Sequence, residues 1–404
     1  MNSKWEIKKM PEVIEWGSGG TPKATVKEYY ENGDIPWLII GDLNNGIVTK
    51  SETKITKLGL DNSSAKMIPP NTLLVAMYGS IGKLGITGIE CCTNQAIAFA
   101  KKMHGVTTKY MFYYMAMMKS KLISKGKGGT QKNISQTVLN SLDVIVPPLE
   151  EQHRIVTRIE ELFSQLDSGI ETLKKTKEQL KVYRQAVLKE AFESASSSNS
   201  KNLTINDLLT KKKKGMTTGP FGTMLKKHEH QSSGVPVLGI ENIGKDGFVD
   251  GNKIFVSEEK AKELSAFKVD TDDLIISCSG TVGEICIVPP HMKNALLSTN
   301  LMRISLDYDV IRADYFMYLF KSKGVVIDQV KELCKGSTRM FLNQTILKQI
   351  IFPVPTLKIQ AKIIETIESR LSVCDSIEKT IDTALQEAEA LRQSILKQAF
   401  EGGL

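Results

Sequence analysis

Apolar residues recur every seven positions through two long stretches of the chain. The first stripe consists of Ile159, Leu166, Leu173, Leu180 and Val187. The second stripe consists of Ile367, Cys374, Ile381, Ala388 and Ile395. Glutamate and lysine fill most positions between them, and an apolar heptad among such charges is typical of a coiled coil. We therefore predict two long helices that begin just after a proline and use these stripes as their core.

The two helices differ in bulk at corresponding positions. Gly169 in the first corresponds to Ile377 in the second, and Leu180 corresponds to Ala388. This difference suggests that the helices pack on each other, with large residues against small ones. The alternative is two independent amphipathic helices, each lying on its own domain.

Both helices belong to an internal repeat. RQAVLKEAFE at 184–193 returns as RQSILKQAFE at 392–401, an offset of 208 residues with seven of ten positions identical. Upstream the two copies are less similar, but GSIGK at 79–83 still corresponds to GTVGE at 280–284. A repeat of this kind must be recognised before a fold is assigned. The chain is two copies of one unit. Each copy has a divergent N-terminal part, here called its front, and a more similar C-terminal part that contains the long helix, here called its tail.

The two fronts mix short β-rich runs with glycine and proline. Leu73–Tyr78 and Asp273–Ser279 are predicted strands, while 109–120 and 314–323 are predicted helices. We predict an α+β fold in which each front is a compact domain around a curved sheet. The predicted boundaries are a first domain (1–146), a first helical region (147–193), a polar linker (194–202), a second domain (203–354) and a second helical region (355–404).

Composition narrows the class of protein. A hydrophobic content of 41% and a charged content of 24% are ordinary for a globular chain. No apolar run of about 18 residues occurs, and the first residues do not lead into a secretory segment, so we expect a cytoplasmic protein. The net charge of +8 is compatible with a nucleic-acid partner but does not by itself establish one.

Catalytic and metal-binding motifs are missing from the sequence. Its cysteines form no CxxC pair, and no full set of zinc ligands can be assigned. Gly79–Lys83 is not a phosphate-binding loop, because Leu84 follows the lysine and the second copy carries Glu284 in its place. No methyltransferase or hydrolase motif can be assigned either. We therefore expect a non-catalytic protein without a metal or cofactor of its own.

The turns of the two fronts hold the informative residues. Glycine allows close backbone approach, serine and threonine donate hydrogen bonds, lysine and arginine neutralise phosphates, and Gln131 and Arg339 have the reach to bind base edges. The candidate DNA-binding residues are Thr21, Lys23, Tyr78, Ser80, Lys83, Thr130, Gln131, Lys132, Asn133, Thr218, Lys226, Lys227, Ser279, Thr281, Thr338, Arg339 and Asn343. Their recurrence at matching places in two diverged copies favours a DNA interface over solvated loops.

The segment PPLEEQ at 147–152, followed by IVTRIEELFSQLD and RQAVLKEAF, resembles the specificity subunit of type I restriction–modification systems. The match covers the whole chain, although the second tail departs from the pattern with PVPTLKIQ and with Arg370 at a seam position. The resemblance implies two target-recognition domains alternating with two conserved helices. These helices would pair as an antiparallel coiled coil about a pseudo-twofold axis.

The resemblance also implies a function. Each domain would read half of a split, asymmetric site in double-stranded DNA, while the helices set the gap and recruit two modification subunits and, through them, restriction subunits. S-adenosylmethionine, ATP and Mg²⁺ would be used by those partners, which methylate adenine and cleave DNA. Our candidates for exposed partner-binding residues on the tails are Gln152, Glu160, Arg184, Phe192, Gln360, Glu368, Arg392 and Phe400.

Two other functions stay open at this point. A coiled-coil scaffold joining two protein-binding modules would bind DNA weakly and without sequence preference. A recognition chain of a related type II-like system would serve one partner that both methylates and cuts. Neighbouring genes would separate the second alternative from a type I system.

Overall fold

A computed structural model describes residues 5–128, 132–196, 200–221, 224–244, 247–280, 282–322, 324–333 and 341–403. The chain divides into two compact units. Unit 1 comprises Met1–Leu173 and Asp382–Leu404, and unit 2 comprises Lys174–Ile381. Each unit therefore holds one of the two predicted domains together with parts of both long helices.

The two long helices are α6 (Leu149–Ser196) and α12 (Leu357–Glu401). Each begins shortly after a proline, as predicted. Helix α6 continues into the start of the predicted linker, and strand β11 (Lys201–Thr204) begins within the end of that linker. The linker prediction of 194–202 is therefore too long, because both flanking elements extend into its polar sequence.

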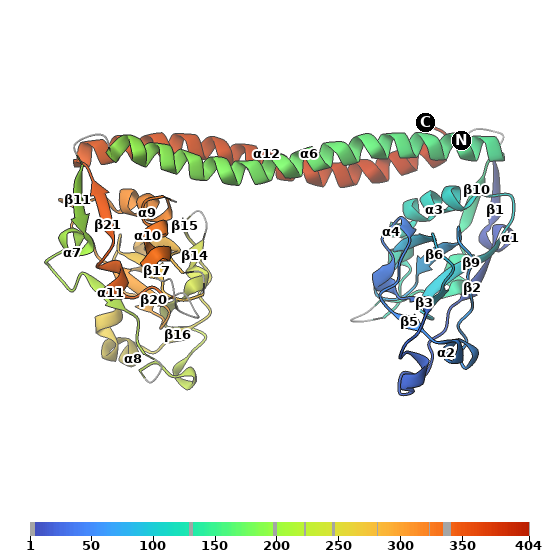
Figure 1. The fold of residues 1–404 in the computed structure, drawn as a ribbon, viewed down its shortest axis with the longest axis horizontal. Coiled ribbons are helices and arrows are strands. Elements are labelled where there is room, and N and C mark those ends of the chain that lie inside the picture. The colour runs from blue at the N-terminus through green and yellow to red at the C-terminus, as the bar shows by residue number, and fades with distance from the viewer. Residues whose placement is uncertain are drawn as a thin grey trace. The chain divides into compact units, whose positions relative to one another are not determined.

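The first domain is built on a five-stranded sheet with the order β2-β9-β6-β7-β4 (Figure 1). Smaller sheets have the orders β5-β3-β8 and β1-β10. The strands are β1 (Glu6–Lys9), β2 (Ile14–Ser18), β3 (Ile35–Leu38), β4 (Ile47–Val48), β5 (Lys54–Ile55), β6 (Leu73–Ala76), β7 (Leu84–Thr87), β8 (Cys92–Thr93), β9 (Ile97–Met103) and β10 (Asp143–Val146). The helices are α1 (Met10–Val13), α2 (Lys57–Asp61), α3 (Thr108–Met117), α4 (Lys119–Ser124) and α5 (Gln136–Asn140), with short 3-10 turns at Lys27–Tyr29 and Ile40–Asp42.

The second domain repeats this plan around a four-stranded sheet with the order β12-β20-β17-β18. Its strands, after β11, are β12 (Met216–Thr218), β13 (Val235–Leu238), β14 (Ile243–Gly244), β15 (Gly247–Phe248), β16 (Phe255–Val256), β17 (Leu274–Ser277), β18 (Ile285–Ile287), β19 (Leu296–Leu297), β20 (Leu301–Ile304) and β21 (Ile351–Val354). Its helices are α7 (Ile205–Leu208), α8 (Glu258–Glu263), α9 (Ala313–Lys321), α10 (Ile327–Leu333) and α11 (Gln344–Leu347). Short 3-10 turns lie at Lys227–Glu229, Ile240–Asn242, Ser265–Phe267 and Pro290–Met292.

The predicted strands and helices of the fronts are confirmed. Strands β6 and β17 are buried throughout, which is why their sequences are continuous apolar runs. Helix α3 starts at Thr108 and is capped by the preceding Thr107, whose side chain accepts a hydrogen bond from the Tyr110 amide. Gly79 and Gly82 adopt φ values of 64° and 73°, so the segment that resembles a phosphate-binding loop is a tight glycine turn between β6 and β7.

One cross-strand pair shows how the two sheets differ in side chains while they keep the same strand pairing. In the first domain Gly17 faces Phe99 across β2 and β9, and a Cβ at Gly17 would lie 2.3 Å from the phenyl ring. In the second domain Thr217 faces Arg303 across β12 and β20, and the Arg303 guanidinium donates to the Thr217 hydroxyl at 3.2 Å. A large ring over glycine is thus replaced by a hydrogen-bonded pair.

Helices α6 and α12 run antiparallel within each unit. In unit 1, Arg392 of α12 pairs with Asp167 of α6 and lies 4.8 Å over the ring of Phe163. In unit 2, Arg184 of α6 pairs with Asp375 of α12. These two ion pairs join equivalent positions of the repeat, since Asp167 and Asp375 share the 208-residue offset of Arg184 and Arg392. The predicted antiparallel pairing is confirmed in both units.

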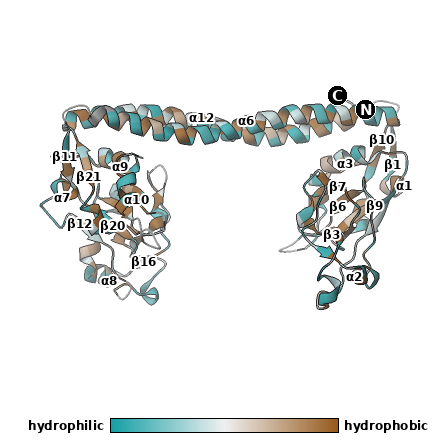
Figure 2. Cartoon of the chain, in the orientation of Figure 1, coloured by the Kyte–Doolittle hydropathy of each residue, from teal (hydrophilic) through white to brown (hydrophobic). Residues whose placement is uncertain are grey.

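The residues of the heptad stripes are buried for the most part. Ile159, Leu180, Val187, Ile367, Ile381 and Ile395 are buried, and Leu166 and Leu173 are half-buried. Figure 2 shows hydrophobic and hydrophilic residues alternating along both helices. Gly169, Tyr183 and Ile377, each three positions after a member of these stripes, are instead exposed. Near the start of each helix the stripe belongs to the adjacent domain, since Ile159 and Ile367 pack in the two domain cores.

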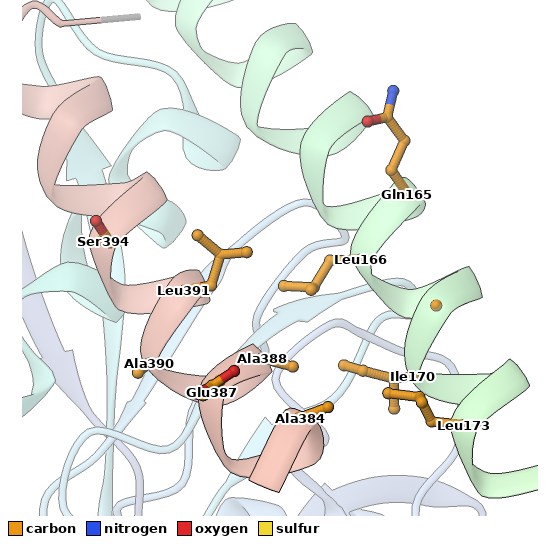
Figure 3. A pocket seen from close by; sticks show the side chains of 11 residues that line it. Gln165, Leu166, Ile170, Leu173, Ala384, Glu387, Ala388, Ala390, Leu391 and Ser394 are labelled. Carbon is orange, nitrogen blue, oxygen red and sulfur yellow. The ribbon is translucent and has the colours of Figure 1, made fainter. Parts of the chain in front are cut away.

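A groove of about 620 Å³ opens along the helix pair of unit 1. Leu166, Ile170 and Leu173 of α6 line one wall, and Ala384 and Ala388 of α12 line the other (Figure 3). Large side chains of one helix thus lie opposite small side chains of the other at this place, which is the pattern expected from their difference in bulk. Gly169 also lines the groove. No atom lies within 4 Å of a Cβ built on Gly169.

Replacing Gly169 with alanine should raise the free energy of unfolding of unit 1 by about 1 kcal/mol, because glycine is the poorer helix former and the new methyl group meets open space. Urea unfolding measures the change. Gly105→Ala is the matched control: Gly105 has a φ of 69°, so the same substitution should cost about 1–2 kcal/mol there. A destabilising effect at Gly169 would contradict the open groove.

Candidate nucleic-acid interface

Two loops of the first domain meet at the end of β6. The Ile134 amide donates to the Met77 carbonyl oxygen at 2.9 Å, and the Gly79 amide donates to the Lys132 carbonyl oxygen at 3.2 Å. Tyr78 and Asn133 form a β-bridge between the same segments. The turn after β6 and the segment before α5, which are far apart in sequence, thus form one surface.

The loop after β2 lies at the same edge of the sheet, because β2 and β6 both run antiparallel to β9 between them. Its glycines serve packing within the protein. The Gly20 amide donates to the Thr93 carbonyl oxygen at 2.9 Å, and a Cβ at Gly19 would lie 2.1 Å from that oxygen. The glycines therefore hold the loop against the domain, and the side chains that follow them carry its exposed chemistry.

The candidate residues of the first domain lie on these loops. Lys23, Tyr78, Ser80, Lys132 and Asn133 are exposed. Thr21 is also exposed, and its hydroxyl hydrogen bonds to the Gln95 side chain. Lys83 turns away, because its ammonium donates to the carbonyl oxygens of Ile40 at 3.1 Å and Gly41 at 3.2 Å. Thr130 and Gln131 lie outside the described residues.

The second domain brings the equivalent loops together. The Leu342 amide donates to the Cys278 carbonyl oxygen at 2.9 Å, which repeats the contact between Ile134 and Met77. The Gln344 side chain donates to the Thr218 hydroxyl at 3.1 Å and so joins the loop after β12 to the start of α11. The arrangement of loops is therefore common to both domains, although the side chains on them differ.

The candidate residues of the second domain follow the same distribution. Lys226 and Lys227 are exposed, and Ser279 donates to the Asn300 side chain at 2.9 Å. Asn343 caps α11 by accepting a hydrogen bond from the Ile346 amide at 2.8 Å. Thr281, Thr338 and Arg339 lie outside the described residues.

A buried arginine supports the basic run KKKK at 211–214. The Arg303 guanidinium donates to the Lys214 carbonyl oxygen at 3.0 Å and to that of Lys268. Burial lowers the pKa of Arg303, while the nearby carboxylate of Asp273 opposes the shift. Lys213 bonds to Asp273 at 3.1 Å, so this lysine of the run is neutralised by the protein itself.

The prediction that Gln152 and Gln360 are exposed partner-binding residues is wrong, because both are fully buried. The Gln152 side chain accepts from the Thr107 amide at 2.9 Å and donates to the carbonyl oxygens of Gly105 and Pro147. Gln360 makes the same three bonds to the second domain. Its partners are the Arg312 amide and the carbonyl oxygens of Val310 and Pro355. Each glutamine joins a long helix to its domain.

Phe192 and Phe400 are also buried, which contradicts their predicted exposure. The Phe400 ring meets Tyr110 and Tyr114 edge to face, at centroid distances of 5.2 and 5.1 Å. Phe192 meets Tyr315 in the same way at 5.4 Å. A large apolar group at a helix end usually needs a partner, and here the partner is a helix of the chain's own domain.

The other predicted partner-binding residues make contacts within the chain, apart from one. Glu160 accepts from Lys109 at 2.8 Å, and Arg184 and Arg392 form the ion pairs between α6 and α12. Glu368 is exposed. Of these residues, Glu368 alone presents an exposed side chain on the described part of the tails.

Titratable groups of the described residues give no sign of nucleophilic chemistry. Burial raises the pKa of the thiols of Cys91, Cys92, Cys278 and Cys286 to about 12, so they are protonated at neutral pH. No cluster of three or more potential metal ligands occurs in the ranges that the structure describes. Within those ranges no helix has both the length and the apolar character needed to cross a membrane.

Two exposed phenylalanines were not among the candidate residues. Phe221 follows β12, and Phe341 precedes α11, so both lie beside the loops that converge in the second domain. An apolar residue between glycines in a basic, polar loop, as in GPFG at 219–222, is the sequence signal that could have identified Phe221.

Comparison with known proteins gives consistent results. The family model of the type I restriction modification DNA specificity domain matches residues 2–182 and again residues 198–387. The EcoBI specificity subunit of Escherichia coli is 26% identical over 358 residues, which cover 83% of this chain and 74% of that protein. The EcoKI specificity subunit of Escherichia coli K12 is 23% identical over 404 residues, covering 95% and 85%.

Solved structures share the fold. A chain from a study of complex assembly and conformational transition of the type I R-M system aligns with a TM-score of 0.75 at 15% identity, covering 100% of this chain and 99% of that one. The HsdS subunit from Thermoanaerobacter tengcongensis aligns with a TM-score of 0.58 at 15% identity, covering 100% and 98%. The predicted fold class is thereby confirmed.

Proposed function

The chain belongs to the family of the type I restriction modification DNA specificity domain and carries that domain twice, and we propose that each copy reads one half of a split, asymmetric DNA target. In this proposal the chain has no catalytic role. Two modification subunits would bind the helical regions, use S-adenosylmethionine and methylate adenine, and restriction subunits would cleave with ATP and Mg²⁺. The complex would act in the cytoplasm, where it would have access to chromosomal DNA.

One observation carries the proposal: two divergent domains keep the same three converging loops. The contact between Ile134 and Met77 recurs between Leu342 and Cys278, while the exposed side chains around it change. Two domains that recognise different half-sites need the same loop arrangement with different side chains. Contacts to phosphates position the protein on DNA, and side chains at base edges specify the sequence. A scaffold that binds proteins would have no reason to place lysines at both sets of loops.

The experiment that tests the function is a genome-wide map of N6-methyladenine in the source cell, with the gene intact and deleted. We expect the deletion to remove methylation from one split motif with a fixed gap. A map that is unchanged, together with no methylation after reconstitution with the neighbouring modification subunit, would overturn the proposal. A fused methyltransferase–nuclease gene beside this one would instead indicate the type II-like alternative.

Removing the central heptad from each helix (172–178 and 380–386) should shorten the target gap by about 3 base pairs, because seven residues span about 10 Å of helix. The half-sites should not change, since no loop is altered. The same methylation map measures both quantities. A shortened chain that methylates the original motif with its original gap would show that the helices do not set the spacing.

Alanine at Arg339 should alter the second half-site alone, whereas alanine at Lys23 should weaken binding to all sequences and reduce its salt dependence. The reason is that a guanidinium group can donate two hydrogen bonds to the edge of one base, whereas an exposed lysine neutralises phosphate charge in any sequence. Selection of bound sequences from a random pool, repeated at two salt concentrations, separates the effects. Equal weakening for every sequence with Arg339→Ala would exclude base reading by this residue.

A further inference from the structure

Phe221 is an exposed apolar residue in the loop after β12. Its side chain is 70% exposed, although phenylalanine is usually buried. The two residues before it are buried: Pro220 packs into the domain, and a Cβ at Gly219 would lie 1.9 Å from the Ser298 carbonyl oxygen. The Gly219 amide also donates to the Leu301 carbonyl oxygen at 2.8 Å. The phenyl ring therefore projects from a fixed base.

The corresponding position in the first domain is polar. Gly19, Gly20 and Thr21 take the places of Gly219, Pro220 and Phe221, and Gly19 makes the same close approach to the Thr93 carbonyl oxygen. The Thr21 hydroxyl hydrogen bonds to Gln95. The two domains thus hold this loop alike and differ in whether a hydroxyl or a phenyl ring stands at its tip.

The surroundings of Phe221 suit a nucleic acid. Lys226 and Lys227 are exposed a few residues further on, and the nearest acid in sequence, Glu229, is paired with Lys260 at 2.8 Å. The loop is tied through Thr218 to Gln344, beside the segment that carries the candidate base-reading residues. Phosphates held by the lysines would bring a base edge to the loop tip.

A phenyl ring cannot read a base through hydrogen bonds, so its specificity must come from an apolar group of the DNA. The C5 methyl group of thymine in the major groove is the apolar group that distinguishes one base pair from the others. We propose that Phe221 is a specificity-determining residue that contacts a thymine methyl group in the second half-site. This inference rests on the proposed function and deepens it for one position of the target.

The test uses the full chain in complex with its modification subunits and duplexes that carry the mapped motif. Each thymine of the second half-site is replaced in turn by deoxyuridine, which lacks only the methyl group. At one position the replacement should weaken binding by the wild-type complex about fourfold, the effect of one buried methyl group. The Phe221→Ala complex, and the Phe221→Thr complex that copies the first domain, should show no such loss. Replacements in the first half-site are the control and should affect all three complexes equally.

The possible outcomes distinguish failure of the proposed thymine contact from failure of the proposed function on which it rests. A second half-site without thymine, or a deoxyuridine effect that is the same with and without the ring, would overturn the contact. So would equal weakening of every duplex by Phe221→Ala, which is expected of a ring wedged between base pairs. Failure of the wild-type complex to prefer the mapped motif would instead overturn the proposed function.

Discussion

Replacing Phe400 with alanine should destabilise the first domain by about 3–5 kcal/mol while the second domain stays folded. Phe400 is the largest residue at the end of α12, and none of its surface is exposed. Its ring lies against Tyr110 and Tyr114 of α3, and Leu396 of the same helix joins that core. The substitution therefore leaves a cavity within the first domain, although the changed residue lies almost 300 residues further along the chain.

Hydrogen exchange of amides in α3 and β6, compared with those in α9 and β17, measures the effect in each domain separately. Phe192→Ala is the matched variant, because Phe192 ends α6 and packs on Tyr315 of the second domain. We expect it to expose α9 and to leave α3 protected. Loss of protection in both domains from either variant would mean that the helix ends do not stabilise the domains individually.

The periodic parts of the structure could be predicted from the sequence. The heptad stripe located both long helices, and the 208-residue offset predicted that Asp167 and Arg392 have equivalents in Asp375 and Arg184. These features depend on local spacing, which a sequence displays directly. The glycine turn at Gly79 was predictable for the same reason, because glycines between two apolar segments are a local signal of a tight turn.

The burial of the tail residues could not be predicted in the same way. Gln152 and Phe400 were expected to be exposed, because the resemblance implies that partner subunits bind the helical regions. Their burial depends on α3 and the strands around it, which come from distant sequence. A signal was present for Phe192: it follows Leu188 by four residues and so continues the buried face of α6. Periodicity was a better guide there than position in the helix.

The candidate DNA interface is predictable only in outline. The loops that carry Tyr78 and Asn133 were identified from residue types, and they do come together. The glycines were misread, however, because their amides bond within the domain, as Gly20 does with Thr93. Glycine permits close approach of any neighbour, and a sequence does not say whether that neighbour is DNA or the protein's own backbone.

Replacing Gln152 with alanine should cost about 1–3 kcal/mol of folding stability, since it leaves the carbonyl oxygen of Pro147 buried without this partner and removes the bonds to the partly buried Thr107 amide and to the Gly105 carbonyl oxygen. Gln360→Ala should cost a similar amount in unit 2, where the same three bonds recur. Gln165→Ala, at an exposed position of α6, is the control and should stay within about 0.5 kcal/mol of wild type. Urea unfolding followed separately in each unit measures the losses.

Gln152→Glu tests the hydrogen bonds more sharply, because it keeps the shape and removes both donated protons. The pKa of the introduced carboxyl should be raised above its unfolded value, since it would be buried and face two carbonyl oxygens. A raised pKa in the folded state means that the protonated form is the stabilised one. The loss should therefore be complete at neutral pH and shrink as the pH falls through the folded pKa, whereas the loss from Gln152→Ala should not follow this titration.

The two substitutions together decide what Gln152 does. Equal, pH-independent losses would mean that only its packing matters, and no loss would mean that the helix does not need this attachment. If the hydrogen bonds hold the first domain in one orientation on α6, the complex carrying Gln152→Glu should also methylate sites with a wrong gap at neutral pH. Fidelity of the gap would then depend on two buried glutamines that never touch DNA.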